Sequence, residues 1–122
     1  MAITDAVLEA TGRAIDAIRP GARASGIDTA AREVLKARGY ANAFRHATGH
    51  GVGFAAINHD ALPRIHPLSD EILEPGMVFN IEPAVYIPGF GGMRQCNMVA
   101  GTDTGVELLT GFQNETRDLI LR

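Results

Sequence analysis

The chain changes its pattern of apolar residues at Tyr40, and this change restricts the fold more than any other feature. Before it, apolar residues recur at spacings of three and four, which predicts helices. The first predicted helix ends at "RPG", residues 19–21, and the second lies within "IDTAAREVLKARGY", with Asp28 or Thr29 as N-cap and Gly39 as the C-terminal stop. The inward faces of these two amphipathic helices are expected to carry Val7, Leu8, Thr11, Ala14, Ile15 and Ile18, and Ala31, Val34 and Leu35.

After Tyr40 the apolar runs shorten to strand length, and glycine and proline become frequent. "GMVFNIEPAVYI" predicts a buried strand, and "PGFGG" predicts a turn. "MRQCNMVAG" and "VELLT" predict two further strands, separated by "TDTG". Residues 54–75 form a long irregular connection, of a length that is usually functional or mobile. Helices followed by antiparallel strands predict an α+β fold.

The composition bounds the size and the class of the protein. The 122 residues fit one domain, 1–122, with a single core. The net charge is −3 and basic residues are scattered singly, so no nucleic-acid partner is expected. No apolar stretch approaches the ~20 residues that cross a bilayer, so no membrane partner is expected either. The N-terminus lacks the pattern of a signal peptide and the single Cys96 cannot form an intrachain disulfide, which favours a cytoplasmic location.

Two residues stand out as candidates for chemistry. Strand alternation places Glu82 on the same face as Asn80 and opposite Phe79. A carboxylate in so apolar a strand needs a cation, a metal or several donors, and a salt bridge to Arg94 is the alternative to a functional site. His50, in the glycine-rich motif "HATGHGVG", is either a ligand or a histidine hydrogen-bonded at a strand end.

Taken together, the motifs "TGHGVG", "LEPGMVFNIEPAVYIPGFGGMR" and "TDTGVELLT" resemble, in order and spacing, the C-terminal half of the creatinase, prolidase and aminopeptidase P family. The resemblance extends back through "AIRPGARASGIDTAAREVLKARGY" and covers nearly the whole chain. It implies half of a pita-bread fold, with the two amphipathic helices packed on a curved antiparallel sheet.

The resemblance also implies a metal-ligand set. In metal-dependent members, two aspartates, one histidine and two glutamates hold two divalent ions that activate a water. His50 matches the ligand histidine and Glu82 the first glutamate, whereas Cys96 stands at the position of the second. The two aspartates lie upstream of the helical pair in the family, and these 122 residues hold no counterpart, so three of the five ligands are expected to be missing. No cofactor is therefore expected, and the alternative is a single zinc ion held by His50, Glu82 and Cys96.

Other site residues follow from the same resemblance. The family uses a second histidine to bind substrate or stabilise the transition state, and His59 is the nearest counterpart, with His66 as a weaker candidate. Arg94 is the arginine that precedes the second ligand position, and we assign it with His59 to substrate binding. Catalysis, if retained, would use His50, His59 and Glu82. Both loop histidines can equally be solvated residues without a function.

The resemblance leads to three hypotheses about function. The favoured one is a truncated family member without two-metal peptidase activity that binds a small peptide-like ligand or a partner. Because half of this fold leaves an exposed sheet, we expect a homodimer that imitates the two halves. The second is a metal-independent or single-metal hydrolase of the Xaa-Pro peptidase or creatinase type, completed by dimerisation. The third is one subunit of a split enzyme whose partner chain supplies the aspartates.

Overall fold

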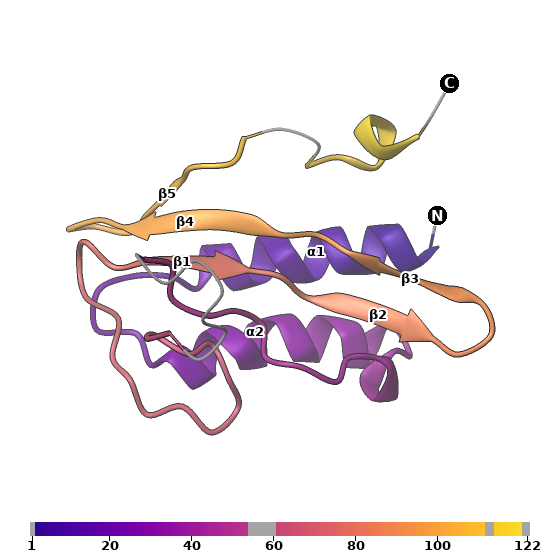
Figure 1. Cartoon of the computed structure of the whole chain (residues 1–122), viewed down its shortest axis with the longest axis horizontal. Coiled ribbons are helices and arrows are strands. Elements are labelled where there is room, and N and C mark those ends of the chain that lie inside the picture. The colour runs from indigo at the N-terminus through magenta and orange to yellow at the C-terminus, as the bar shows by residue number, and fades with distance from the viewer. Residues whose placement is uncertain (1, 54–60, 112–113, 121–122) are drawn as a thin grey trace.

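Two helices lie side by side and cover one face of the strands (Figure 1). The computed structural model describes residues 2–53, 61–111 and 114–120. Helix α1 spans Ala2–Asp16 and α2 spans Ala24–Ala37, so both predicted helices are confirmed, and α1 ends before "RPG". The residues that the helices bury are Ala6, Val7, Ala10, Thr11 and Ala14 in α1, and Ala24, Ile27, Asp28, Ala31 and Leu35 in α2.

The start of α2 corrects the sequence prediction. The N-cap is Arg23, not Asp28 or Thr29, and the helix begins a turn earlier than expected. The amide of Ala24 donates to Glu71 O at 2.9 Å, so a neighbouring segment satisfies a donor at the helix start without a side-chain cap. The end was predicted correctly, because Gly39 follows the helix with a φ of 84°, a conformation that glycine adopts without strain.

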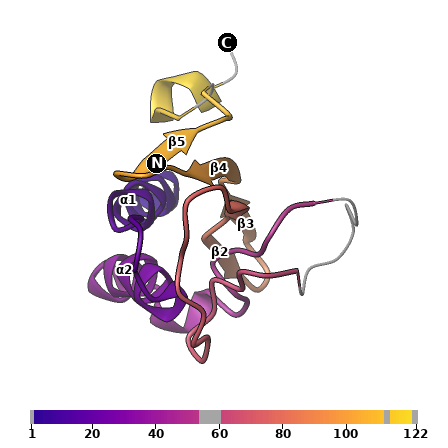
Figure 2. The ribbon, with the colours of Figure 1, turned by 90° about the vertical axis from the view of Figure 1, so that its left-hand side faces the viewer.

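The strands form two antiparallel groups. Strands β1 (Val78–Ile81), β4 (Asn97–Gly101) and β5 (Val106–Leu108) make a three-stranded sheet in the order β1-β4-β5. Strands β2 (Ala84–Ile87) and β3 (Gly91–Arg94) make a hairpin. Helices on one side of antiparallel strands confirm the α+β class (Figure 2).

Each of the two long strands predicted from the sequence is interrupted. The first breaks at Glu82 and Pro83, between β1 and β2, and the second at Gln95 and Cys96, between β3 and β4. Proline has no backbone N–H for a ladder, which accounts for the first break. Because Ile81 pairs with Asn97 and Ala84 pairs with Arg94, the two breaks lie opposite each other. Glu82 and Cys96 are therefore brought to the same level of the sheet.

The core lies between the helices and the strands. Phe79 and Ile81 of β1 are fully buried there, as are Leu35 of α2 and Ile65 of the connection that follows the glycine motif. Residues 61–75 contain no helix or strand, as predicted, and are attached by isolated bridges of Ile65 to Gly49 and of Ile72 to Arg23. The short 3-10 helices η1 (Ala41–Ala43) and η2 (Thr116–Leu119) complete the described elements.

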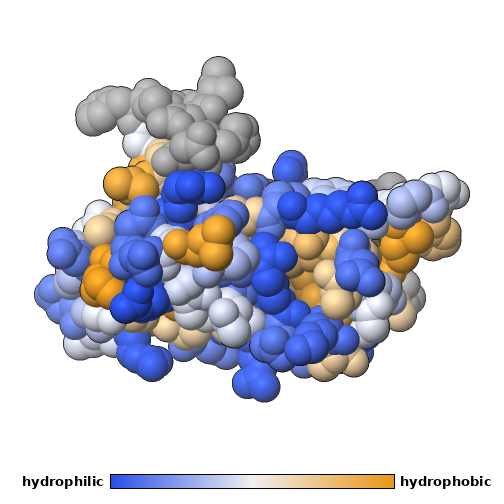
Figure 3. Space-filling model, turned by 90° about the horizontal axis from the view of Figure 1, so that it is seen from below, coloured by the Kyte–Doolittle hydropathy of each residue, from blue (hydrophilic) through white to orange (hydrophobic). Residues whose placement is uncertain are grey.

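The surface seen from below is mainly hydrophilic, with separate apolar patches (Figure 3). In the part of the chain that the structure describes, no helix combines the length and the apolar character needed to span a bilayer.

Candidate functional site

The glycine motif runs along β1 as an additional extended segment. Three hydrogen bonds join the two: Val52 N to Val78 O at 2.9 Å, Asn80 N to His50 O at 2.9 Å, and Glu82 N to Thr48 O at 2.6 Å. They fix His50 and Glu82 in register with each other.

Gly49 makes the close approach to β1 sterically feasible, and Gly51 does the same for the approach of the loop at Leu62. A Cβ placed on Gly49 would lie 1.8 Å from Asn80 O, and one on Gly51 would lie 1.9 Å from Leu62 O. Each distance is far below van der Waals contact, so any side chain at either position would push the backbones apart. The glycine density of the motif is therefore a requirement of backbone packing around His50.

Asn80 holds His50 through both its backbone and its ring. His50 N donates to Asn80 Oδ1 at 2.8 Å, and Asn80 Nδ2 lies 3.1 Å from His50 Nε2. His50 Nδ1 lies 2.9 Å from Gly51 O, which can only accept, so Nδ1 carries the proton and Nε2 accepts from the amide. A backbone carbonyl that fixes the Nδ1–H tautomer is also the support that metal-binding histidines commonly have.

Glu82 approaches the same nitrogen of the imidazole as Asn80. Its Oε1 is 3.8 Å from His50 Nε2, and the two side chains are 14% and 13% exposed. This contact becomes an ion pair only when the ring is protonated. Among the described residues Glu82 contacts His50 and the thiol of Cys96, and no salt bridge to Arg94, the alternative considered from the sequence, is seen there.

Cys96 is the third residue of this cluster, and it lies at the strand break opposite Glu82. Its Sγ lies 3.9 Å from Asn80 Nδ2, and the residue is exposed. Although the residue is exposed, its sulfur is partly removed from water, and this desolvation and the negative charge of Glu82 raise the pKa of the Cys96 thiol above its ordinary value, while the charge of Arg94 acts in the opposite direction. The thiol therefore remains protonated at neutral pH.

Over residues 2–53, 61–111 and 114–120, no group of three or more histidine, cysteine, aspartate or glutamate side chains is placed to hold a metal ion. His50, Glu82 and Cys96 meet around Asn80 as a hydrogen-bonded cluster.

The remaining predicted residues lie elsewhere. His59 lies outside the described residues. His66 belongs to the loop 61–75, where its Nδ1 accepts from Leu68 N at 3.1 Å, and it lines a separate cavity of about 420 Å³. Arg94 is exposed at the end of β3, within electrostatic reach of Cys96.

Sequence reasoning missed two organising residues, Asn80 and Thr48. Asn80 was placed on the correct face but given no role, although a polar residue in an otherwise apolar strand signals a hydrogen-bonding function. It also missed the hydrogen bond between His46 Nε2 and the hydroxyl of Tyr86, at 3.0 Å.

Comparison with known proteins shows the family of this chain. The model of metallopeptidase family M24 matches residues 1–103, so the chain belongs to this family. The Xaa-Pro dipeptidase of Pyrococcus furiosus is 42% identical over 113 residues, which are 93% of this chain and 32% of that protein. A putative dipeptidase of Bacillus subtilis is 37% identical over 120 residues, or 98% of this chain and 31% of the relative.

Solved structures show the same relationship. The prolidase from Pyrococcus furiosus superposes with a TM-score of 0.85 at 41% identity, covering 91% of this chain and 32% of that one. The X-Pro aminopeptidase from Thermotoga maritima gives 0.85 at 32% identity, covering 93% and 31%. The chain spans about a third of the length of these relatives.

The state of the Cys96 thiol leads to a first testable prediction. Alkylation by iodoacetamide at pH 8 should be slow, because burial and Glu82 raise the pKa of Cys96. Glu82→Gln removes the negative charge, so the pKa should fall and alkylation should accelerate. Arg94→Gln removes the positive charge, so alkylation should become slower still. The rate measured against pH in the three proteins tests this order, and equal rates would contradict it.

Proposed function

We propose that this chain is a domain of the metallopeptidase family that binds an Xaa-Pro-like peptide at the His50–Glu82 surface and has no two-metal peptidase activity. The observation that carries the proposal is Cys96. A neutral thiol occupies the strand break opposite Glu82, where the family resemblance places a ligand glutamate. Bridging two divalent cations requires several oxygen donors, and Glu82 supplies the only carboxylate in this cluster of described residues.

The retained residues suit binding of a small polar ligand. Glu82 carries a partly buried carboxylate that can pair with an amino group, and His50 lies beside it. The relatives named as Xaa-Pro dipeptidases and prolidase suggest the class of peptide, which we extend to this chain as part of the proposal.

The experiment uses alanyl-proline as the probe, with and without Zn²⁺ or Mn²⁺. Calorimetry should detect binding of the dipeptide, Glu82→Gln should weaken it about tenfold by removing a charged partner, and chromatography should show the dipeptide intact. Native mass spectrometry should show no metal in the wild type. Metal-dependent cleavage that disappears in His50→Ala would overturn the proposal. Metal-independent cleavage that disappears in both His50→Ala and Glu82→Ala would replace binding with hydrolysis.

Two variants at position 96 distinguish peptide binding from the single-metal alternative. Cys96→Ser leaves a neutral side chain, so binding of alanyl-proline should be retained. A zinc ion that is bound by the wild type and lost from Cys96→Ser would instead establish the single-metal alternative. Cys96→Glu places a second carboxylate beside Glu82 and His50, and it should raise the affinity for Mn²⁺ above that of the wild type.

We propose further that two copies associate through the sheet. In the described part of the chain β5 pairs only with β4, and it carries Leu108, which is 41% exposed, next to Leu109, which is 47% exposed. An apolar strand edge favours pairing with another strand. Native mass spectrometry at micromolar concentration should report a dimer, and a monomer there would refute association.

A further inference from the structure

A buried ion pair in α2 lies outside the cluster of His50, Glu82 and Cys96. Its hydrogen bonds nevertheless connect it to the segment of chain that carries His50. Asp28 is fully buried, although it stands in the middle of the helix. Arg32, one turn later, donates from Nε to Asp28 Oδ2 at 2.6 Å and from Nη2 to Asp28 Oδ1 at 3.2 Å. A carboxylate that is removed from water at this position must be fully paired, so its other partners matter.

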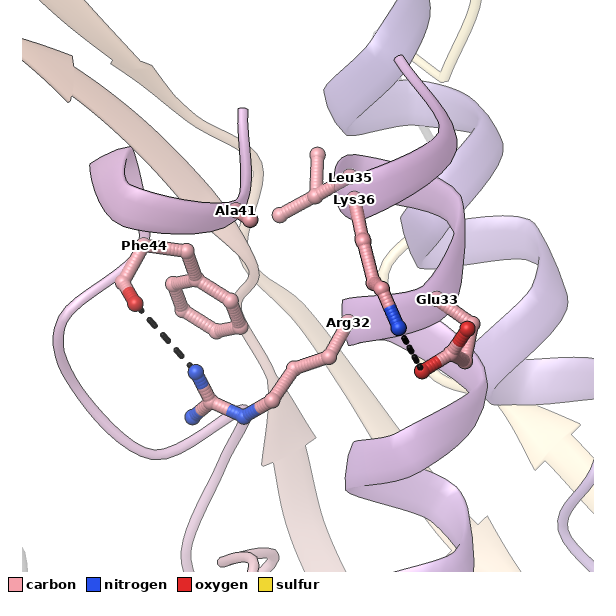
Figure 4. Close-up of a pocket in the computed structure, with 6 residues that line it drawn as sticks. All are labelled: Arg32, Glu33, Leu35, Lys36, Ala41 and Phe44. Atoms are coloured by element: carbon pink, nitrogen blue, oxygen red, sulfur yellow. Dashed lines mark hydrogen bonds and ion pairs between the residues drawn. The ribbon is translucent and has the colours of Figure 1, made fainter. Parts of the chain in front are cut away.

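Those other partners belong to the glycine motif. Asp28 Oδ1 accepts from the Thr48 hydroxyl at 2.8 Å and from Thr48 N at 3.2 Å. Arg32 continues along the same segment, donating from Nη1 to Phe44 O at 3.2 Å and from Nη2 to His46 O at 2.6 Å. Figure 4 shows Arg32 extending from α2 toward Phe44, and its guanidinium carbon lies 4.3 Å from the centre of that ring. The pair thus attaches residues 44, 46 and 48 to one helix.

Thr48 connects the ion pair to β1, through hydrogen bonds near both Glu82 and His50. Its carbonyl accepts from Glu82 N at 2.6 Å, and two residues later His50 O accepts from Asn80 N at 2.9 Å. Thr48 is itself fully buried, so its hydroxyl has a fixed environment.

We infer that Asp28, Arg32 and Thr48 are positioning residues that set the register of the glycine motif on β1 and so bring the side chains of His50 and Glu82 together. They act through hydrogen bonds to the backbone and touch no ligand. The inference depends on the proposed function only where peptide binding is the measured quantity.

The test compares two buried threonines. Thr48→Val removes the hydroxyl while keeping the shape, and Thr48→Ser keeps the hydroxyl. Thr11→Val is the matched control, because Thr11 is also buried but its hydroxyl donates to Val7 O within α1. Amide hydrogen exchange in the full chain is measured at Glu82, at Asn80 and throughout α1, and the affinity for alanyl-proline is measured alongside.

Thr48→Val should accelerate exchange at Glu82 and Asn80 by about tenfold, leave α1 unchanged and weaken peptide binding by about tenfold. Thr48→Ser should restore both quantities to nearly the wild-type values, and Thr11→Val should leave exchange at Glu82 unchanged. Parallel acceleration of all amides in Thr48→Val, or none at Glu82, would overturn the inference. If the wild type binds no alanyl-proline, the proposed function fails while the exchange measurements still decide this inference.

Discussion

Gly49→Ala should detach the glycine motif from β1. The new Cβ would lie 1.8 Å from Asn80 O, a backbone atom that cannot rotate away, so the segment must move outward. That movement breaks ladder hydrogen bonds such as Asn80 N to His50 O, each contributing about 1 kcal/mol, and adds an overpacking cost of about 1–3 kcal/mol. The free energy of unfolding should therefore fall by roughly 3 kcal/mol or more, as measured by urea denaturation.

Gly12→Ala provides the control for this prediction. Gly12 lies within α1, and nothing lies within 4 Å of a Cβ built on it. Alanine there should stabilise the protein by about 0.5–1 kcal/mol, because it favours the helix and restricts the unfolded chain. The two substitutions add the same methyl group, so opposite signs would assign the loss in Gly49→Ala to steric contact. A Gly49→Ala protein as stable as the wild type would disprove the packing argument.

The sequence predicted the α+β class because its signals are periodic. Apolar spacing identified both helices, and short apolar runs identified the strands. It failed at Arg23, since the cap of α2 depends on Glu71 from a distant loop. It also failed at Glu82 and Pro83, where the strand breaks although the apolar run continues. The first error concerns a contact between segments far apart in the chain, which local patterns do not encode, whereas the second overlooked a local signal, the proline that cannot donate to a ladder.

The candidate site followed from the resemblance more than from the residues alone. The resemblance pointed to His50, Glu82 and Cys96 as one site, and the structure brings them together around Asn80. The role of Asp28 could not be predicted in the same way. The residue type and position of Asp28 predict a helix N-cap, and only the fold shows that Thr48 is its partner.

Asp28→Ala should produce the second large effect, a fall of about 3–5 kcal/mol in the free energy of unfolding. The substitution removes the acceptor of four hydrogen bonds, two from Arg32 and two from Thr48. Breaking a buried pair by deleting one partner leaves the other charge without compensation, and this cost exceeds what the pair itself contributes. Thermal and urea denaturation of the variant should both show the loss.

An exposed ion pair between the C-terminal end of α2 and helix α1 supplies the comparison. Arg38 pairs with Glu9 of α1, and their side chains are 48% and 41% exposed. Because water screens that pair, Arg38→Ala should cost less than about 1 kcal/mol, and its effect should shrink further at high salt. The effect of Asp28→Ala should depend little on salt, since Asp28 is fully buried. Equal losses in the two variants, or a strong salt dependence of Asp28→Ala, would show that the pair in α2 is not the anchor of the glycine motif.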